Sequence, residues 1–313
     1  MKIIHCRQLG QTENGINELC FKKNAVALGT FDGLHLGHAM LIREITKDED
    51  TDSYVYTFDV HPSRIILNDP LSPRTITTNE QKVEILAKMG VGHVCFEDFV
   101  SVRDMSPSDF VKKVLIDTLK SDVVVCGFNF TFGKKGEGTS EFLKSELAKY
   151  GAECVIVAPV TSGCVSISST RIRSLIEAGA GDKAAELLGR PFTIRRPVLH
   201  GEMLGRKLGI PTINQSFAED SVVPVSGVYV CKVTVGGKEY PGVCDVGTKP
   251  TVSGKGLLAE THIIGYDGDL YGETVDVAFL KRLRAEKKFS DIDELKSVIE
   301  NDVANAKKYF DIA

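Results

Sequence analysis

The glycine-rich segment LGTFDGLHLGH, residues 28–38, holds two of the chain's seven histidines, three positions apart. It follows an apolar run and precedes an expected helix over residues 39–47. Such a turn gathers free backbone N–H groups at the positive end of a helix dipole, which favours phosphate. Histidines at this spacing can point to the same side and donate hydrogen bonds to phosphoryl oxygens. The segment therefore predicts a phosphate-binding site, in which Gly29, Gly33 and Gly37 allow close approach and His35 and His38 are donors.

A second segment, Ile167–Arg173, reads ISSTRIR and begins a later expected helix. Hydroxyl and N–H groups at a helix N-terminus, together with an arginine guanidinium, can hold a triphosphate. By itself, Ser-Ser-Thr before a helix is more often a plain helix cap. The order of the two segments, and their domain-sized separation, favour a phosphate site over that alternative.

Together the two segments resemble the H-x-G-H and I-S-S-T-x-x-R signatures of the nucleotidyltransferase superfamily. The resemblance implies adenylyl transfer, in which a substrate phosphate attacks the α-phosphorus of ATP and pyrophosphate leaves without a protein nucleophile. Mg²⁺ normally bridges the phosphates in such a reaction. The implied catalytic residues are His35, His38 and Arg173, and the implied ATP-binding residues are Gly29, Phe31, Gly33, Gly37, Ser168, Ser169 and Thr170.

Three further stretches narrow the family: TFDVHP at 57–62, RTITT at 74–78 and GFNFTFG at 127–133. They resemble motifs of the bacterial bifunctional riboflavin kinase/FMN adenylyltransferase family, although Val60 stands where that family usually has proline. The resemblance implies that Asn129 lies near the reacting phosphates and that Phe132 lies near the flavin ring. It also places His61 and Arg74 at the flavin site, with Arg74 on the FMN phosphate.

An aromatic cluster suits a flat, apolar heterocycle such as flavin. Ordinary packing is the alternative for Phe128, Phe130 and Phe132, because alternate residues of an extended segment point the same way.

The second half of the chain contains VLHGEMLGRKLGIPTIN, residues 198–214. No Walker A sequence occurs anywhere, which excludes a P-loop kinase. A glycine-rich flap carrying Arg206 and Lys207 could still cover the phosphates of a nucleotide. A flexible surface loop is the alternative, but it does not explain the Pro-Thr-x-Asn that follows.

This stretch resembles the riboflavin kinase signature G-x-x-x-G-R-x-L-G-x-P-T-A-N, and further matches run to the C-terminus. The resemblance implies that Thr212 and Asn214 hold Mg²⁺ and the ATP phosphates. It makes Glu260 the general base on the ribityl 5′-hydroxyl, since an alcohol is a poor nucleophile until its proton is accepted. It adds Gly201, Gly205 and Lys207 to the ATP site and Arg284 to the flavin site. The chain departs from the family pattern at Arg196, Ile213 and Asp245.

The elements that must position these residues differ between the two halves. The first half alternates continuous apolar runs with helical patterns, which is typical of strands buried on both faces of a parallel sheet. One helix has a capping box at Thr78–Gln81 and ends at Gly90. We expect a Rossmann-like, doubly wound α/β domain that binds ligands beyond the carboxyl ends of its strands. The expected strands are Ala25–Leu28, Tyr54–Phe58, His93–Phe96, Val123–Cys126 and Cys154–Val157.

After Gly189-Arg190-Pro191 the chain becomes rich in β patterns separated by glycines. Val228–Val235 and Tyr240–Val246 flank Gly236-Gly237, which predicts a hairpin. Apolar residues at three- and four-residue spacing from Ile292 to Phe310 predict a closing helix, capped by Ser290. This half is expected to be a small antiparallel β-barrel with a C-terminal helix. The predicted domains are residues 1–182 and 192–313, joined by a linker over 183–191.

Composition excludes several other classes of protein. The 313 residues carry a net charge of −4, which argues against a nucleic-acid partner. No window approaches the roughly 18 apolar residues of a membrane span. The eight cysteines form no C-x-x-C pair, and several lie in apolar runs, which predicts buried thiols in a reducing cytoplasm. Oligomeric state is not inferable from the sequence.

The expected function is bifunctional flavin cofactor synthesis from the small molecules riboflavin, FMN and ATP. The C-terminal domain would convert riboflavin and ATP to FMN and ADP. The N-terminal domain would then convert FMN and a second ATP to FAD and pyrophosphate. Two alternatives are a nucleotidyltransferase with another substrate, such as nicotinamide mononucleotide or phosphopantetheine, and a flavin-binding sensor that has lost catalysis.

Overall fold

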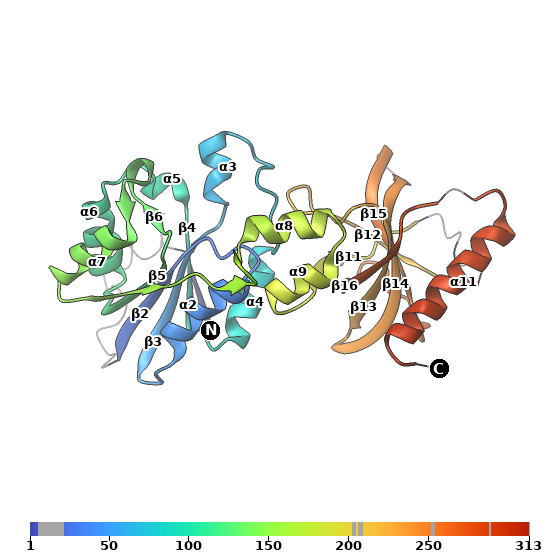
Figure 1. Cartoon of the computed structure of the whole chain (residues 1–313), viewed down its shortest axis with the longest axis horizontal. Coiled ribbons are helices and arrows are strands. Elements are labelled where there is room, and N and C mark those ends of the chain that lie inside the picture. Colours follow the sequence, from blue (N-terminus) through green and yellow to red (C-terminus); the bar gives the residue numbers. More distant parts are fainter. Residues whose placement is uncertain (6–21, 202–204, 206–208, 252–253, 288, 313) are drawn as a thin grey trace. The chain divides into compact units, whose positions relative to one another are not determined.

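The computed structural model describes residues 1–5, 22–201, 205, 209–251, 254–287 and 289–312. The chain divides into two compact units, Met1–Ser169 and Thr170–Ala313 (Figure 1). This division places α9 (Gly181–Leu188) and all of α8 (Ser169–Glu177) after its first residue in the second unit. The predicted domain boundary at residue 182 stays a prediction.

A six-stranded parallel sheet forms the centre of the first unit, in the order β1-β4-β3-β2-β5-β8. The predicted doubly wound α/β fold is thus confirmed. The sequence analysis missed the edge strand β1, and it wrongly expected β8 to be buried on both faces: as the other edge strand, β8 is only partly buried. The strands are β1 (Lys2–His5), β2 (Lys23–Leu28), β3 (Thr51–Phe58), β4 (His93–Glu97), β5 (Val123–Gly127) and β8 (Glu153–Val157).

Helices cover both faces of this sheet, because alternate strand residues point to opposite sides. Leu41, Ile42 and Leu86 of α2 and α4 pack on one face, while the π-helix η1 and α7 pack on the other. The helices are α2 (Leu36–Thr46), α3 (Pro62–Leu67), α4 (Asn79–Lys88), α5 (Phe99–Val102), α6 (Pro107–Asp109), η1 (Phe110–Thr118) and α7 (Ser140–Ala148). Short elements complete the unit: β6 (Thr131–Phe132), the 3₁₀ helix η2 (Lys134–Gly136), β7 (Gly138–Thr139), β9 (Thr161–Ser162) and β10 (Val165–Ser166).

Two helix starts bear on the site. Helix α2 begins at Leu36 rather than at residue 39, because the His35 side chain caps it. Helix α4 begins with the predicted capping box: the Gln81 N–H donates to Thr78 Oγ1 at 3.3 Å, and the Thr78 N–H donates to Gln81 Oε1 at 3.0 Å. The capping box fixes where the first turn of α4 lies.

The second unit is an antiparallel sheet of six strands in the order β11-β16-β13-β14-β15-β12, curled into a nearly closed barrel. The predicted hairpin is confirmed, with Gly236 and Gly237 at φ 56° and 80°, where a side chain would be strained. The strands are β11 (Phe192–Pro197), β12 (Ile213–Ser216), β13 (Gly227–Val235), β14 (Lys238–Thr251), β15 (Gly254–Ile263) and β16 (Thr274–Arg284), and the helices are α8 (Ser169–Glu177), α9 (Gly181–Leu188) and α11 (Ile292–Tyr309).

The barrel closes between its two edge strands. The Gln215 amide, which is fully buried on β12, donates to the carbonyl oxygens of Arg196 at 2.7 Å and Val275 at 2.8 Å. Arg196 Nε donates back to the Ser216 carbonyl oxygen at 3.1 Å. Arg196, where the sequence departs from the family pattern, therefore helps to close the barrel by joining β11 to β12.

The closing helix α11 covers one face of β13 and β14, where Ala306 and Val303 pack against Val230 and Val243. Because the barrel interior lies on its other side, β13 is buried on both faces over residues 227–231. The predicted cap at Ser290 is wrong by one residue: Asp291 caps α11 by accepting a hydrogen bond from the Glu294 N–H. None of the helices in the described part of the chain is long and apolar enough to cross a membrane.

Candidate functional sites

The glycine-rich turn after β2 is strained. Phe31 and Leu34 have φ values of 48° and 41°, and Gly33 has 79°. Left-handed backbone at a non-glycine residue costs about 1–3 kcal/mol and persists only where the surroundings impose it. The surroundings are the buried Asp32, whose Oδ1 accepts from the N–H groups of Ile76 at 2.9 Å and Thr77 at 3.3 Å. The turn is thereby fixed to the segment that precedes α4.

The two histidines lie face to face at the N-terminus of α2. Their ring centroids are 3.7 Å apart at an interplanar angle of 14°, so the prediction that they point to one side is confirmed. His35 Nδ1 accepts the His38 N–H at 3.2 Å. Because that nitrogen is an acceptor, the neutral His35 ring carries its proton on Nε2. Gly37 permits this packing, since a Cβ there would lie 3.0 Å from the His35 ring.

The two signature segments meet within the first unit. Ser169 Oγ donates to the carbonyl oxygen of Asp32 at 2.9 Å, across 137 residues of sequence. Ile167 is buried nearby, with its carbonyl oxygen 3.9 Å from the position of a Gly37 Cβ. Thr170 and Arg173 begin the second unit, where they lie within 3.5 Å of each other.

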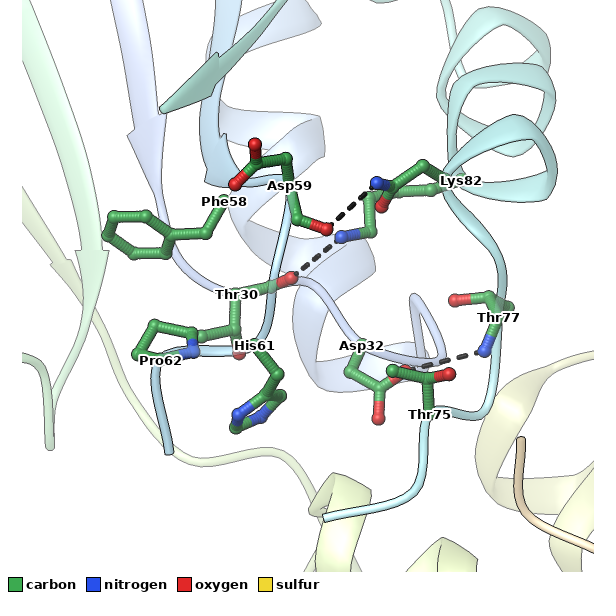
Figure 2. Close-up of a pocket in the computed structure, with 10 residues that line it drawn as sticks. Thr30, Asp32, Phe58, Asp59, His61, Pro62, Thr75, Thr77 and Lys82 are labelled. Carbon is green, nitrogen blue, oxygen red and sulfur yellow. Dashed lines mark hydrogen bonds between the residues drawn. The ribbon is translucent and has the colours of Figure 1, made fainter. Parts of the chain in front are cut away.

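A pocket lies beyond the carboxyl ends of β2 and β3 (Figure 2). Three predicted segments meet there: the glycine-rich turn, the segment after β3, and the threonines before α4. His61 caps α3 with Nδ1, which accepts the Ser63 N–H at 3.2 Å. Arg74 is exposed, immediately before the lining residue Thr75. The lining residues are Thr30, Asp32, Phe58, Asp59, His61, Pro62, Thr75, Thr77, Asn79 and Lys82.

The aromatic candidates take different positions. Phe132 is buried and stacks on Phe130, with ring centroids 5.6 Å apart, in the cluster that η1 and α7 cover. Phe31 is fully buried as well, so only its main chain can face a nucleotide. Phe128 is 49% exposed, and the neighbouring Asn129 is also exposed, just beyond the carboxyl end of β5. For Phe132 the burial favours the packing alternative. The exposed Phe128 ring is better placed than Phe132 to contact a ligand.

Sequence analysis did not single out Lys82, although this lysine lines the pocket. Its side chain is 5% exposed, and Nζ donates to the Thr30 carbonyl oxygen at 3.1 Å. Burial lowers the pKa of Lys82 to about 8. A signal was present in the sequence, because Lys82 lies four residues before the buried Leu86 and so on the buried face of α4.

The second unit brings together three of the residues that the kinase resemblance indicates: Thr212, Asn214 and Glu260. Thr212 Oγ1 donates to Glu260 Oε1 at 2.9 Å. Asn214 on β12 is the cross-strand partner of Glu260 on β15, so their side chains share a face of the sheet. Asp245 on β14 is the partner of Glu260 on its other side. Hydroxyl, amide and carboxylate oxygens of this kind suit Mg²⁺, which keeps several waters and takes further ligands from substrate phosphates.

Glycines bring the main chain close to this cluster. A Cβ at Gly201 would lie 2.4 Å from Asn214 Nδ2, and one at Gly205 would lie 3.3 Å from Thr212 Oγ1. Arg206 and Lys207 lie outside the described residues. Arg284 pairs with Asp302 of α11, with Nη2 donating to Oδ2 at 2.8 Å.

Two family models match the chain, one to each half. Residues 18–171 match the model described as FAD synthetase, and residues 188–310 match the one described as riboflavin kinase. The bifunctional riboflavin kinase/FMN adenylyltransferase of Bacillus subtilis strain 168 is 35% identical over 296 residues, which cover 92% of this chain and 93% of the relative. The protein of that name from Escherichia coli K12 is 32% identical over 290 residues, covering 91% and 92%.

A solved structure resembles the whole fold. It is titled as a macrolide-efflux protein from Streptococcus pneumoniae, and it is 30% identical to this chain with a TM-score of 0.86. The match covers 98% of this chain and 99% of that one. The same arrangement of elements thus occurs in a second protein along its whole length.

Proposed function

The chain belongs to the family of bifunctional riboflavin kinase/FMN adenylyltransferases, and on that premise we propose that its two units catalyse successive steps of flavin cofactor synthesis. The second unit transfers the γ-phosphoryl group of ATP to riboflavin and releases ADP. The first unit transfers the adenylyl group of another ATP to the resulting FMN and releases pyrophosphate. The observation that carries the proposal is that each unit holds a cluster of motif residues: His35, His38 and Ser169 at the glycine-rich turn of the first, and Thr212, Asn214 and Glu260 in the second.

In the kinase step, Glu260 accepts the proton of the ribityl 5′-hydroxyl as the oxygen attacks the γ-phosphorus. Thr212 donates to Glu260 Oε1, which orients the carboxylate. When bound, Mg²⁺ neutralises phosphate charge; Thr212 and Asn214 are the residues that would hold it. Gly201, Gly205 and Lys207 are proposed contacts for ATP, and Arg284 is a proposed flavin contact.

In the adenylyl transfer, a phosphate oxygen of FMN attacks the α-phosphorus and the bond to pyrophosphate breaks. His35 and His38 stabilise the charge that develops on the phosphoryl oxygens, together with N–H groups at the start of α2. Ser168, Ser169 and Thr170 extend this cradle, and Arg173 and Asn129 are proposed partners of the reacting phosphates. Arg74 and His61 are proposed to bind FMN.

The location of the protein in the cytoplasm stays a prediction.

The test is a coupled turnover assay. Purified protein receives riboflavin, ATP and Mg²⁺, and chromatography follows the flavins over time. We expect FMN and ADP first, then FAD and pyrophosphate. Absence of both flavin products would overturn the proposal. A parallel panel with nicotinamide mononucleotide and phosphopantetheine tests the alternative substrates, and flavin binding without ATP turnover would instead indicate a sensor.

A further inference from the structure

Lys82 occupies a place that is electrostatically unfavourable for a lysine. It completes the first turn of α4, close to the positive end of the helix dipole, and its side chain is almost fully buried. Removing an ammonium group from water is costly unless a partner compensates for it. An apolar residue would fill the space without that cost, so packing alone does not account for the lysine.

The partners among the residues that the structure describes satisfy only part of the ammonium group. Nζ donates one hydrogen bond, to the Thr30 carbonyl oxygen, although an ammonium group has three donors. The Phe96 ring lies on another side, with its centroid 5.7 Å from Nζ. Among the described residues, no carboxylate forms an ion pair with Lys82.

The nearby carboxylates are already engaged. Asp32 Oδ1 accepts from two backbone N–H groups, and Asp59 Oδ1 accepts the Val60 N–H at 2.8 Å. Figure 2 shows the Lys82 ammonium group inside the pocket, between the glycine-rich turn and the segment that leads to His61. Lys82 therefore lines the space that a ligand would enter.

We propose that Lys82 is a further anion-binding residue of the adenylyl-transfer site, whose ammonium group donates to a phosphate oxygen of a bound substrate. The inference rests on the proposed function of the first unit. Two sources supply the same chemistry, the phosphate of FMN and the phosphates of ATP. The Thr30 carbonyl oxygen holds the ammonium group beside the strained turn, so the charge is in place before the substrate arrives.

The proposal has a pH signature. Burial lowers the pKa of Lys82 to about 8, while the carboxylates of Asp32 and Asp59 act in the opposite direction. His61 is the other titratable group that lines the pocket. Lys82 carries its charge below about pH 8 and loses it above, so anion binding weakens as the pH rises through that value.

The experiment measures FMN-to-FAD conversion by the full-length chain and its variants Lys82→Met and Lys82→Arg. Lys88→Met is the matched control, because Lys88 is exposed on the same helix. Riboflavin phosphorylation in the same samples reports whether the protein is folded. We expect Lys82→Met to lower kcat/KM about tenfold to a hundredfold, as for a lost charged hydrogen bond, and to abolish the fall near pH 8. Lys82→Arg should retain most activity and move that fall to higher pH.

The KM values distinguish the two sources: a rise for FMN assigns the contact to its phosphate, and a rise for ATP assigns it to the triphosphate. A kcat/KM of Lys82→Met within twofold of wild type would overturn the inference, as would a loss of activity that leaves the fall near pH 8 in place. If Lys82→Met also loses kinase activity, the Lys82→Arg variant decides. A fall in activity that moves to higher pH supports the inference, and a fall that stays near pH 8 overturns it. Wild-type protein that makes no FAD would instead refute the proposed function.

Discussion

Single residues in the two sites differ in the hydrogen bonds that they already make. In the first unit, His35 Nδ1 is occupied as a helix cap, so a neutral His35 can donate to a phosphate only through Nε2. In the second unit, Glu260 Oε1 is occupied by the Thr212 hydroxyl. The Thr212 hydroxyl thereby orients the carboxylate that is proposed to act as the general base.

The variant Glu260→Gln tests the role of Glu260 as the general base. We expect riboflavin phosphorylation to fall at least about a hundredfold, because the amide cannot accept the proton of the hydroxyl. FMN-to-FAD conversion should stay unchanged, and adding FMN should restore FAD formation. Steady-state assays of both reactions check this, with Glu239→Gln as a control on the exposed end of β14. Equal loss of both activities in a folded variant would contradict the assignment of separate sites.

Lys82 also predicts how stability depends on pH. In the unfolded chain its pKa is about 10.5, and in the folded chain about 8, so between these values the unfolded state binds more protons. The contribution of Lys82 to the free energy of unfolding is therefore largest above pH 10.5 and is lost as the pH falls through 8. The two limits of this contribution differ by about 3 kcal/mol.

We expect the free energy of unfolding of wild type, relative to Lys82→Met, to rise over that interval. Urea titrations at several pH values measure it. The variant should be the more stable protein at pH 7, and a difference that does not change with pH would contradict the burial argument.

At the scale of elements, one ion pair fastens the closing helix to the barrel. Arg284 at the end of β16 donates from Nε and Nη2 to Asp302 of α11, whose side chain is 4% exposed. The resemblance implies that Arg284 also contacts the flavin, and that role stays a proposal. Lys232 and Glu239 make an exposed pair on the same barrel, which offers a comparison.

Asp302→Ala should lower the free energy of unfolding of the second unit by about 3 kcal/mol, because a half-buried guanidinium is left without its partner. Glu239→Ala should change it by less than about 1 kcal/mol, as is usual for surface pairs. Urea unfolding followed by circular dichroism compares the two variants. Similar effects of both substitutions would show that burial does not strengthen the Arg284 pair.

At the scale of the whole molecule, α8 and α9, the two helices before the barrel, determine where the chain can be divided into fragments. Gly181 lies against the carbonyl oxygen of Leu280 on β16, and Leu187 and Leu188 of α9 are buried. Sequence analysis placed residues 183–191 in a linker because composition changes after Gly189. The division into compact units groups α9 and nearly all of α8 with the barrel, and the linker stays a prediction.

Two fragments test this grouping, one comprising residues 170–313 and the other residues 192–313. We expect the longer fragment to phosphorylate riboflavin and to unfold at a higher urea concentration, because it keeps the apolar face of α9 on the barrel. Kinase assays and urea titrations measure both properties. Equal stability of the two fragments would support the shorter predicted domain.

The sequence by itself determined the order of the two folds, the hairpin at Gly236-Gly237, the capping box of α4 and the segments that resemble the family signatures. These follow from local rules, since glycine conformations, helix caps and apolar periodicity depend on a few neighbouring residues. The family resemblance likewise depended on the residues of each motif and on the order of the motifs.

Only the tertiary structure decided which of those side chains are buried and which line the pocket. Phe132 and Phe31 belong to motifs yet lie in the core, whereas Lys82 belongs to none of the motifs and lines the pocket. Two hydrogen bonds join residues that are far apart in the chain: one from Ser169 to Asp32 and one from Arg196 to Ser216. Burial and long-range hydrogen bonds depend on how the sheet and barrel pack, which no short stretch of sequence encodes.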